Sequence, residues 1–191
     1  MALMLRMVAV AVLVVAVTAM APNVSWAVDA FLKIADCDGP EKTKGFEKQI
    51  HLTGFDAKAT NTLTITGGGA GAGKAVIGSI EVLKDVDQCS PQFYLDTVSG
   101  TRIASATITF VQPNRTSFFQ IKLTDVLITS IEHMTVTKGE KTIQDAGTLD
   151  LNSATVTGLQ EVVGLTFSKI QLTDLVSGKT AAFDQRTGTA N

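Results

Sequence analysis

Hydrophobic and polar side chains alternate along most of the chain after residue 28, with the period of two that is typical of half-buried β-strands. In the clearest run, Phe119, Ile121 and Leu123 alternate with polar residues. The same pattern predicts strands at residues 31–34, 46–55, 61–66, 76–83, 103–111, 119–124 and 126–130. Because many of these strands have one polar face, the pattern predicts a mainly β domain of antiparallel strands.

The alternation changes phase in two places. Leu123 and Val126 would both face the core, which predicts a β-bulge near Thr124 and Asp125. Residues 165–172 show the same change of phase, and we interpret them as a pair of strands.

One short α-helix is predicted between the strands. Ser90 supplies an N-cap hydroxyl, and Pro91 suits the first helical position. Phe93 and Thr97 recur at the i, i+4 spacing of one helix face, and Gly100 is a typical C-terminal stop. A helix of about two to three turns does not persist alone, so we expect it to pack on the sheet.

Two long segments show no clear period, and we expect both to be irregular. Residues 67–73 carry almost no side chains, whereas residues 137–158 mix charged residues with glycine and leave room for an extra hairpin. The first segment nearly matches the phosphate-binding pattern G-x-x-x-x-G-K-[ST], but Ala75 replaces the hydroxyl that holds Mg²⁺. A strand pattern also follows it where a helix is required. We therefore interpret it as a glycine-rich loop between strands.

Residues 1–27 have the composition of a secretory signal peptide. Arg6 is the only charge, and residues 7–21 are almost entirely hydrophobic but too short to span a bilayer comfortably. Ser25 and Ala27 place small residues at the −3 and −1 positions of the bond between Ala27 and Val28, which is the predicted cleavage site. The expected domains are a signal peptide at 1–27 and a β domain at 28–191, in a secreted or periplasmic protein.

Two alternatives to this cleavage fit the sequence less well. A cut after Ala21 would place Pro22 beside the scissile bond, where its locked φ and missing N–H fit poorly. The second alternative is an uncleaved N-terminal anchor, which the short apolar run disfavours. Export would permit a disulfide between Cys37 and Cys89, and the alternative is two buried free thiols.

Composition and charge exclude several functional classes. The 191 residues are 45% hydrophobic and 18% charged, so the chain can bury a core. The formal net charge of −2 argues against a dedicated binder of nucleic acid or anionic membrane. With two His and two Cys, no zinc, haem or iron–sulfur framework can be drawn, so we expect no metal and no cofactor.

Candidate catalytic and metal-binding residues are weak. Asp36, Asp38 and Glu47 match three positions of a calcium loop, but the required glycine is absent. His51 and His133 each stand alone on polar strands, and no serine lies in a nucleophile motif. The chain is therefore not expected to be an enzyme.

Taken in order, several segments resemble the Hcp family, the haemolysin-coregulated tube proteins of type VI secretion. Residues 28–34 resemble that family's first strand, and residues 67–74 resemble its glycine-rich extended loop. Residues 80–100 resemble the strand and helix that follow, and residues 119–130 resemble its long strand. Residues 161–172 and 179–184 resemble its penultimate and last strands. The resemblance covers nearly the whole chain after the signal peptide.

The resemblance implies an antiparallel β-barrel of two sheets with one short flanking helix. It also implies homohexameric rings that stack into a hollow tube, and contacts with secretion-machine or effector proteins. It assigns the contact between stacked rings to Gly67, Gly68, Gly69, Gly71, Gly73 and Lys74. The alternative is a monomeric secreted β-sandwich that acts as a binding or adhesion module.

Overall fold

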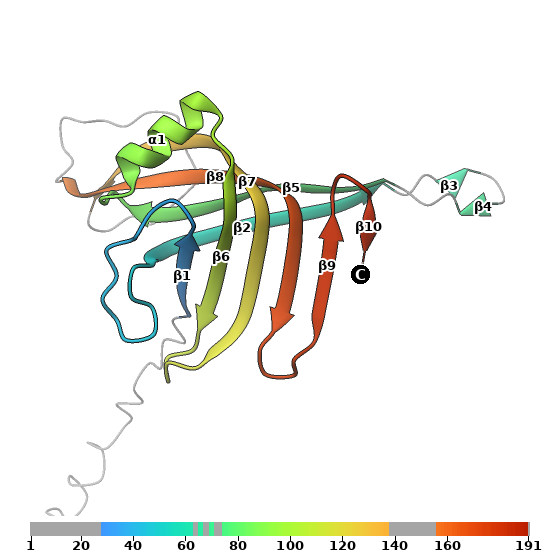
Figure 1. Ribbon diagram of the computed structural model, residues 1–191, viewed down its shortest axis with the longest axis horizontal. Coiled ribbons are helices and arrows are strands. Elements are labelled where there is room, and N and C mark those ends of the chain that lie inside the picture. Colours follow the sequence, from blue (N-terminus) through green and yellow to red (C-terminus); the bar gives the residue numbers. More distant parts are fainter. Residues whose placement is uncertain (1–27, 63–64, 67–68, 71–73, 138–155, 191) are drawn as a thin grey trace, which may run out of the picture.

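The computed structural model describes residues 28–62, 65–66, 69–70, 74–137 and 156–190. The elements, labelled in Figure 1, are β1 (Asp29–Ile34), β2 (Ile50–Thr62), β3 (Ile65–Thr66), β4 (Gly69–Ala70), β5 (Lys74–Asp85), α1 (Ser90–Ser99), β6 (Ile103–Val111), β7 (Ser117–Thr137), β8 (Val156–Asp174), β9 (Thr180–Asp184) and β10 (Thr189–Ala190). The predicted fold class, mainly β with one short helix, is confirmed.

Six of the strands close a barrel. Backbone hydrogen bonds join β8, β5, β2, β1, β6 and β7 in that order, and β7 then pairs again with β8. Every neighbouring pair is antiparallel. β9 and β10 continue the sheet beyond β8.

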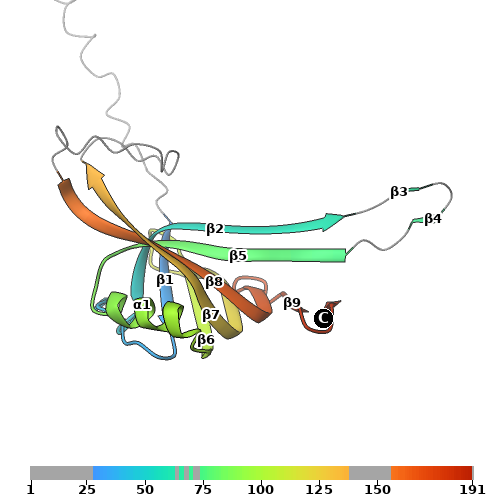
Figure 2. The same ribbon diagram turned by 90° about the horizontal axis from the view of Figure 1, so that it is seen from above.

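The two longest strands belong to both walls of the barrel (Figures 1 and 2). β8 pairs with β5 through residues 160–165 and with β9 through residues 169–173. We call β1, β6, β9 and the adjoining halves of β7 and β8 the front sheet. The back sheet consists of β2, β5 and the other halves of β7 and β8.

The core lies between the two sheets and is filled by the apolar members of the alternating pattern. α1 covers one opening of the barrel, and its Phe93 enters the core with 1% of its surface exposed. Each large aliphatic side chain buried in this way contributes roughly 1.5–3 kcal/mol. The most completely buried are Leu32, Ile50, Ile80, Val82, Ile103, Ile108, Leu123, Val126, Val163 and Leu165.

Three neighbouring strands change their inward face at the same level. Leu123 and Val126 of β7 are both buried, with Thr124 and Asp125 between them, and β6 and β8 show the same spacing of buried residues beside this point. The predicted bulge here is wrong, because Thr124 and Val126 keep one register with both neighbouring strands. The left-handed φ of Asp125, 57°, marks the bend instead.

This shared bend also corrects the interpretation of residues 165–172. Phe167 and Ile170 are both buried on one continuous strand, β8, and not on a pair of strands. The register shifts of β7 against β8 lie elsewhere, between Ile128 and Ser130 and between Val136 and Thr137. A common bend lets one long strand serve both sheets, so the change of phase reflects barrel closure.

The helix forms over the predicted residues, but its start differs in detail. The N-cap is Cys89, and Ser90 is the first helical residue, so Ser90 does not cap the helix as expected. Its hydroxyl oxygen instead accepts a hydrogen bond from the Asp87 backbone N–H at 2.9 Å. Gly100 ends the helix with a left-handed φ of 63°, which glycine adopts without a Cβ penalty.

The segment between β1 and β2 is longer than the pattern predicted, because β2 begins at Ile50 and not at Phe46. The Phe46 ring stacks on Phe31 of β1, with ring centroids 4.3 Å apart. A Cβ on Gly39 would lie 2.2 Å from the Gln49 carbonyl oxygen, so only glycine fits there. This segment therefore folds back over the front sheet.

Of the two segments expected to be irregular, only parts are described. Gly69–Ala70 form β4, which pairs with Ile65–Thr66 of β3. Residues 67–68, 71–73 and 138–155 lie outside the described residues, and β8 already begins at Val156.

Candidate assembly surfaces

The β2–β5 hairpin projects from the barrel as a two-stranded arm (Figure 2). The two strands pair from Leu52 and Lys84 at the barrel to Thr62 and Lys74 at the far end. The barrel supports only the first part of this arm, because β1 stops pairing with β2 at Leu52. The arm carries the predicted glycine-rich loop, of which Gly69 lies in β4 and Lys74 begins β5, whereas Gly67, Gly68, Gly71 and Gly73 lie outside the described residues.

The back sheet has two edges without a strand partner among the described residues. On one side, β2 beyond Leu52 pairs only with β5. On the other side, β7 pairs with β6 as far as Val126, and residues 127–137 pair only with β8. Such edges present unpaired backbone N–H and C=O groups, which can pair with another chain. The periodicity of the sequence did not reveal these edges.

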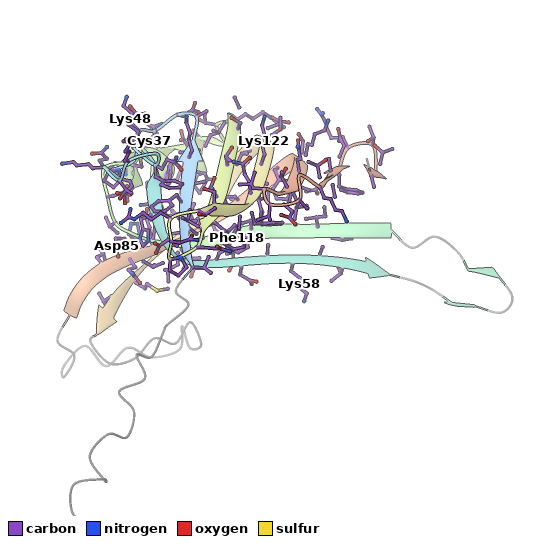
Figure 3. The ribbon with its side chains drawn as sticks, turned by 90° about the horizontal axis from the view of Figure 1, so that it is seen from below. Cys37, Lys48, Lys58, Asp85, Phe118 and Lys122 are labelled. Atoms are coloured by element: carbon purple, nitrogen blue, oxygen red, sulfur yellow. A yellow bond between two sulfur atoms is a disulfide. The ribbon has the colours of Figure 1, made fainter. Side chains whose placement is uncertain are left out.

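The structure joins Cys37 to Cys89 in a disulfide, with the Cα atoms 5.9 Å apart (Figure 3). Cys37 follows β1, and the fully buried Cys89 lies at the start of α1. The bond therefore ties the β1–β2 segment to the helix. Oxidation of this pair in the exported protein stays a prediction.

A buried ion pair links α1 to the back sheet. The Lys84 ammonium of β5 and the Glu161 carboxylate of β8 are both fully buried, with Nζ and Oε1 2.7 Å apart. Lys84 Nζ also lies 3.1 Å from Asp87 Oδ1 and 5.6 Å from the centre of the Phe93 ring. Ser90 Oγ donates a hydrogen bond to Glu161 Oε1 at 2.8 Å. Sequence analysis missed this cluster.

The second oxygen of Glu161 faces a half-exposed histidine. His133 Nε2 lies 3.2 Å from Glu161 Oε2, within ion-pair distance. This contact is an ion pair and not a hydrogen bond, and Oε2 has no hydrogen-bond partner among the described residues. The contact is therefore electrostatic and depends on the charge of the imidazole. It connects the half of β7 that pairs only with β8 to the buried cluster.

Two surface carboxyl groups are held by specific donors. Arg102 donates a hydrogen bond to Asp125 at 2.8 Å and holds the pKa of that carboxyl below its ordinary value. Thr43 donates to Glu41 at 2.6 Å and lowers the pKa of Glu41 in the same way. Both contacts favour the ionised carboxylate, so their stabilising effect is lost as the pH falls through these pKa values.

Two of the acidic residues that match a calcium loop, Asp38 and Glu47, have separate partners. Asp38 pairs with Lys48 at 2.9 Å, and Glu47 accepts a hydrogen bond from the Gly45 backbone N–H. His51 lies 3.5 Å from Asp29. Among the described residues, no group of three His, Cys, Asp or Glu side chains is placed to hold a metal ion. None of the described helices has both the length and the apolar run that a membrane crossing needs.

The fold and these surfaces define a β-barrel protein with a projecting arm, a buried structural ion pair and two sheet edges that have no strand partner in the described part of the chain. Residues 31–173 match the family model described as "Type VI secretion system effector, Hcp". The chain belongs to the Hcp family of type VI secretion, as the ordered segments of the sequence indicated. No curated protein matches it.

Solved Hcp structures share the fold. Hcp1 from Salmonella typhimurium is 20% identical with a TM-score of 0.67, over 86% of this chain and 99% of that chain. A type VI secretion system effector from Yersinia pestis is 19% identical with a TM-score of 0.60, over 81% and 98%. The secreted protein Hcp3 from Pseudomonas aeruginosa is 20% identical with a TM-score of 0.57, over 83% and 98%.

Proposed function

We propose that the mature chain is a structural protein that assembles into hexameric rings, which stack into a hollow tube, and that it catalyses no reaction. Membership of the Hcp family supports a role in type VI secretion. The observation that carries the ring is a pair of edges, on β2 and β7 at opposite sides of one sheet, that no other described strand covers.

Two different edges favour a ring over a simple dimer. When one edge of a protomer pairs with the other edge of its neighbour, each contact is heterologous and leaves one edge of each kind free. Repetition of this contact closes a ring when the rotation between neighbours is right. Hydrogen bonds between strands of neighbouring copies then satisfy the exposed backbone groups.

Sedimentation velocity and negative-stain microscopy of the mature protein test this function. A ring species with a central hole is the expected result. A protein that stays monomeric at high concentration with its fold intact contradicts the ring and leaves a monomeric binding or adhesion module.

The glycine-rich loop at residues 67–73 is the proposed contact between stacked rings. Glycine lets two backbones approach closely because no Cβ lies between them. The loop also loses conformational entropy on docking, so each contact is weak and many act together. Shortening residues 67–73 is therefore expected to abolish stacking and to leave single rings. Microscopy of the variant beside the wild-type protein measures this, and tubes of normal length from the shortened variant contradict it.

We further propose that residues 1–27 direct export and are removed, so that the domain works outside the cytoplasm, either secreted or periplasmic. The small residues before Val28 support cleavage after Ala27. The intact mass of the exported protein is expected to correspond to a chain that begins at Val28. A mass that includes residues 1–27 contradicts cleavage and favours a membrane anchor.

A further inference from the structure

The end of β7 is held to the rest of the barrel mainly by polar groups. Beyond Val126 this strand pairs only with β8, and the end of β7 and the start of β8 run side by side away from β2 and β5 (Figure 2). Ile131 is half-buried and packs against the core. The next two described side chains on the same face are His133 and Thr135, both polar. Contacts of these polar side chains therefore matter for how firmly the end of β7 is held.

The buried cluster beside this strand carries an unbalanced negative charge. The Lys84 ammonium lies close to two carboxylates, 2.7 Å from Glu161 and 3.1 Å from Asp87, so the three groups have a net charge of −1 when both acids are ionised. Oε1 of Glu161 accepts hydrogen bonds from Lys84 and Ser90, whereas Oε2 has no hydrogen-bond partner among the described residues. Because an uncompensated buried charge is costly, one further positive charge at Oε2 would stabilise the cluster.

His133 is the group that can supply this charge. Its Nε2 lies 3.2 Å from Glu161 Oε2, while Lys84 contacts the other oxygen of the same carboxylate. The His133 side chain is 42% exposed, so its imidazole exchanges protons with water. Imidazole is the side-chain group that ordinarily changes its charge between pH 5 and 8. The protonated ring balances the charge of the cluster, and the neutral ring leaves it unbalanced.

The other ionisable groups around His133 have different positions or partners. Glu132 is its neighbour in sequence and lies on the opposite face of β7. β6 carries no ionisable side chain, and β8 has two besides Glu161, both paired towards the other end of β7. α1 has an exposed phenol and a buried carboxylate that accepts a hydrogen bond from Gln92. These four groups are Lys169, Asp174, Tyr94 and Asp96. Among the described residues, Glu161 is the only ion-pair partner of His133.

We propose that His133 makes the β7 edge sensitive to pH, so that protonation of its imidazole fixes residues 127–137 on β8 and favours ring assembly at mildly acidic pH. This inference rests on the proposed ring, in which the β7 edge pairs with the β2 edge of a neighbour. An edge that is in place for only part of the time lowers the apparent affinity between copies by that fraction. Because the protonated form makes the contact, the stabilisation is present at the acidic end of the imidazole range and is lost as the pH rises through it.

Hydrogen exchange of the mature protein tests the edge itself, at a concentration at which sedimentation shows protomers. Protection of residues 127–137, relative to the intrinsic exchange rate at each pH, is expected to fall about fivefold between pH 5.5 and pH 8, the size of effect that a half-exposed ion pair gives. The variant His133→Gln is expected to show the same protection at both pH values. Residues 103–111 of β6 serve as the internal control. Glu41 and Asp125, whose pKa values lie below the ordinary range, stay ionised throughout.

Sedimentation velocity at matched higher concentrations measures the effect on the ring. The ring fraction of the wild type is expected to fall as the pH rises from 5.5 to 8, and that of His133→Gln is expected to stay constant. His51→Gln removes the only other histidine of the chain, whose contact with Asp29 at 3.5 Å is exposed. This matched variant is expected to keep the pH dependence of the wild type, which separates the β7 edge from the total charge of the protein.

The two measurements distinguish this inference from the proposed ring. Rings that form equally at every pH keep the ring and overturn the role of His133. Protection of residues 127–137 that depends on pH through His133, in a protein that forms no rings, overturns the ring and keeps the pH-sensitive edge. Equal pH dependence in the wild type and His133→Gln, or loss of the pH dependence in His51→Gln, overturns the inference.

Discussion

The variant Glu161→Ala is expected to lower the free energy of unfolding of the mature domain by about 3–5 kcal/mol. Lys84 is fully buried and loses the carboxylate 2.7 Å from its ammonium group. Asp87 remains 3.1 Å away, but the buried Ser90 hydroxyl also loses its acceptor. Since small domains are stable by roughly 5–15 kcal/mol, this change removes a large part of the total. Urea unfolding followed by circular dichroism measures it.

Replacing both charges is expected to do much less harm than removing one. The double variant Lys84→Met/Glu161→Leu removes the desolvation penalty together with the attraction, so its stability should approach that of the wild type. Lys48→Gln is the surface control, since the Lys48–Asp38 pair is exposed, and it should not shift the unfolding midpoint measurably. A Glu161→Ala midpoint equal to that of the control contradicts a structural role for the buried pair.

The sequence contained a signal for this pair that the pattern analysis did not use. Lys84 continues the inward parity of Ile80 and Val82, and Glu161 occupies the inward parity of Val163 on β8. Charged residues at two core positions, with opposite signs, are expected to meet when the strands pair. The sequence does not specify that β5 and β8 are neighbours. A period of two shows which side chains of a strand face the core, but it does not show which strand lies beside it.

The lack of information on strand pairing also explains which parts of the fold could be predicted. Strand alternation depends on local side-chain order, so the strands and the mainly β class follow from the sequence. Barrel closure depends on long-range pairing. In the sequence, the bend at Asp125 shows only as a change of phase in the alternation, which resembles that of a bulge. Likewise, Ser90 matches an N-cap by local order, but its hydroxyl is drawn into the buried cluster by Glu161, which is 71 residues away.

The candidate surfaces divide in the same way. The glycine-rich loop at residues 67–73 could be predicted from composition. The Cys37–Cys89 pairing could be predicted because the chain has only two cysteines. The open edges of β2 and β7 emerge only once the neighbours of each strand are known. The contact between His133 and Glu161 likewise depends on register and not on sequence order.

Removal of the disulfide is expected to be the other large effect on stability. The bond closes a loop with a sequence separation of 52, for which the chain-entropy model gives about 4 kcal/mol. For a domain of this size, that corresponds to a fall in Tm of roughly 8–16 °C. The double variant Cys37→Ser/Cys89→Ser should therefore melt well below the oxidised wild type. Circular dichroism melts with and without reductant measure the difference.

The reductant supplies the control for this prediction, because it should lower the Tm of the wild type and leave the double serine variant unchanged. The loss should appear first around the β1–β2 segment, since the bond ties that segment to the start of α1 and keeps Phe46 stacked over Phe31. Hydrogen exchange at residues 38–49 would report this loosening before global unfolding. Two alkylatable thiols in the natively exported protein, detected by mass spectrometry without reductant, contradict the pairing itself.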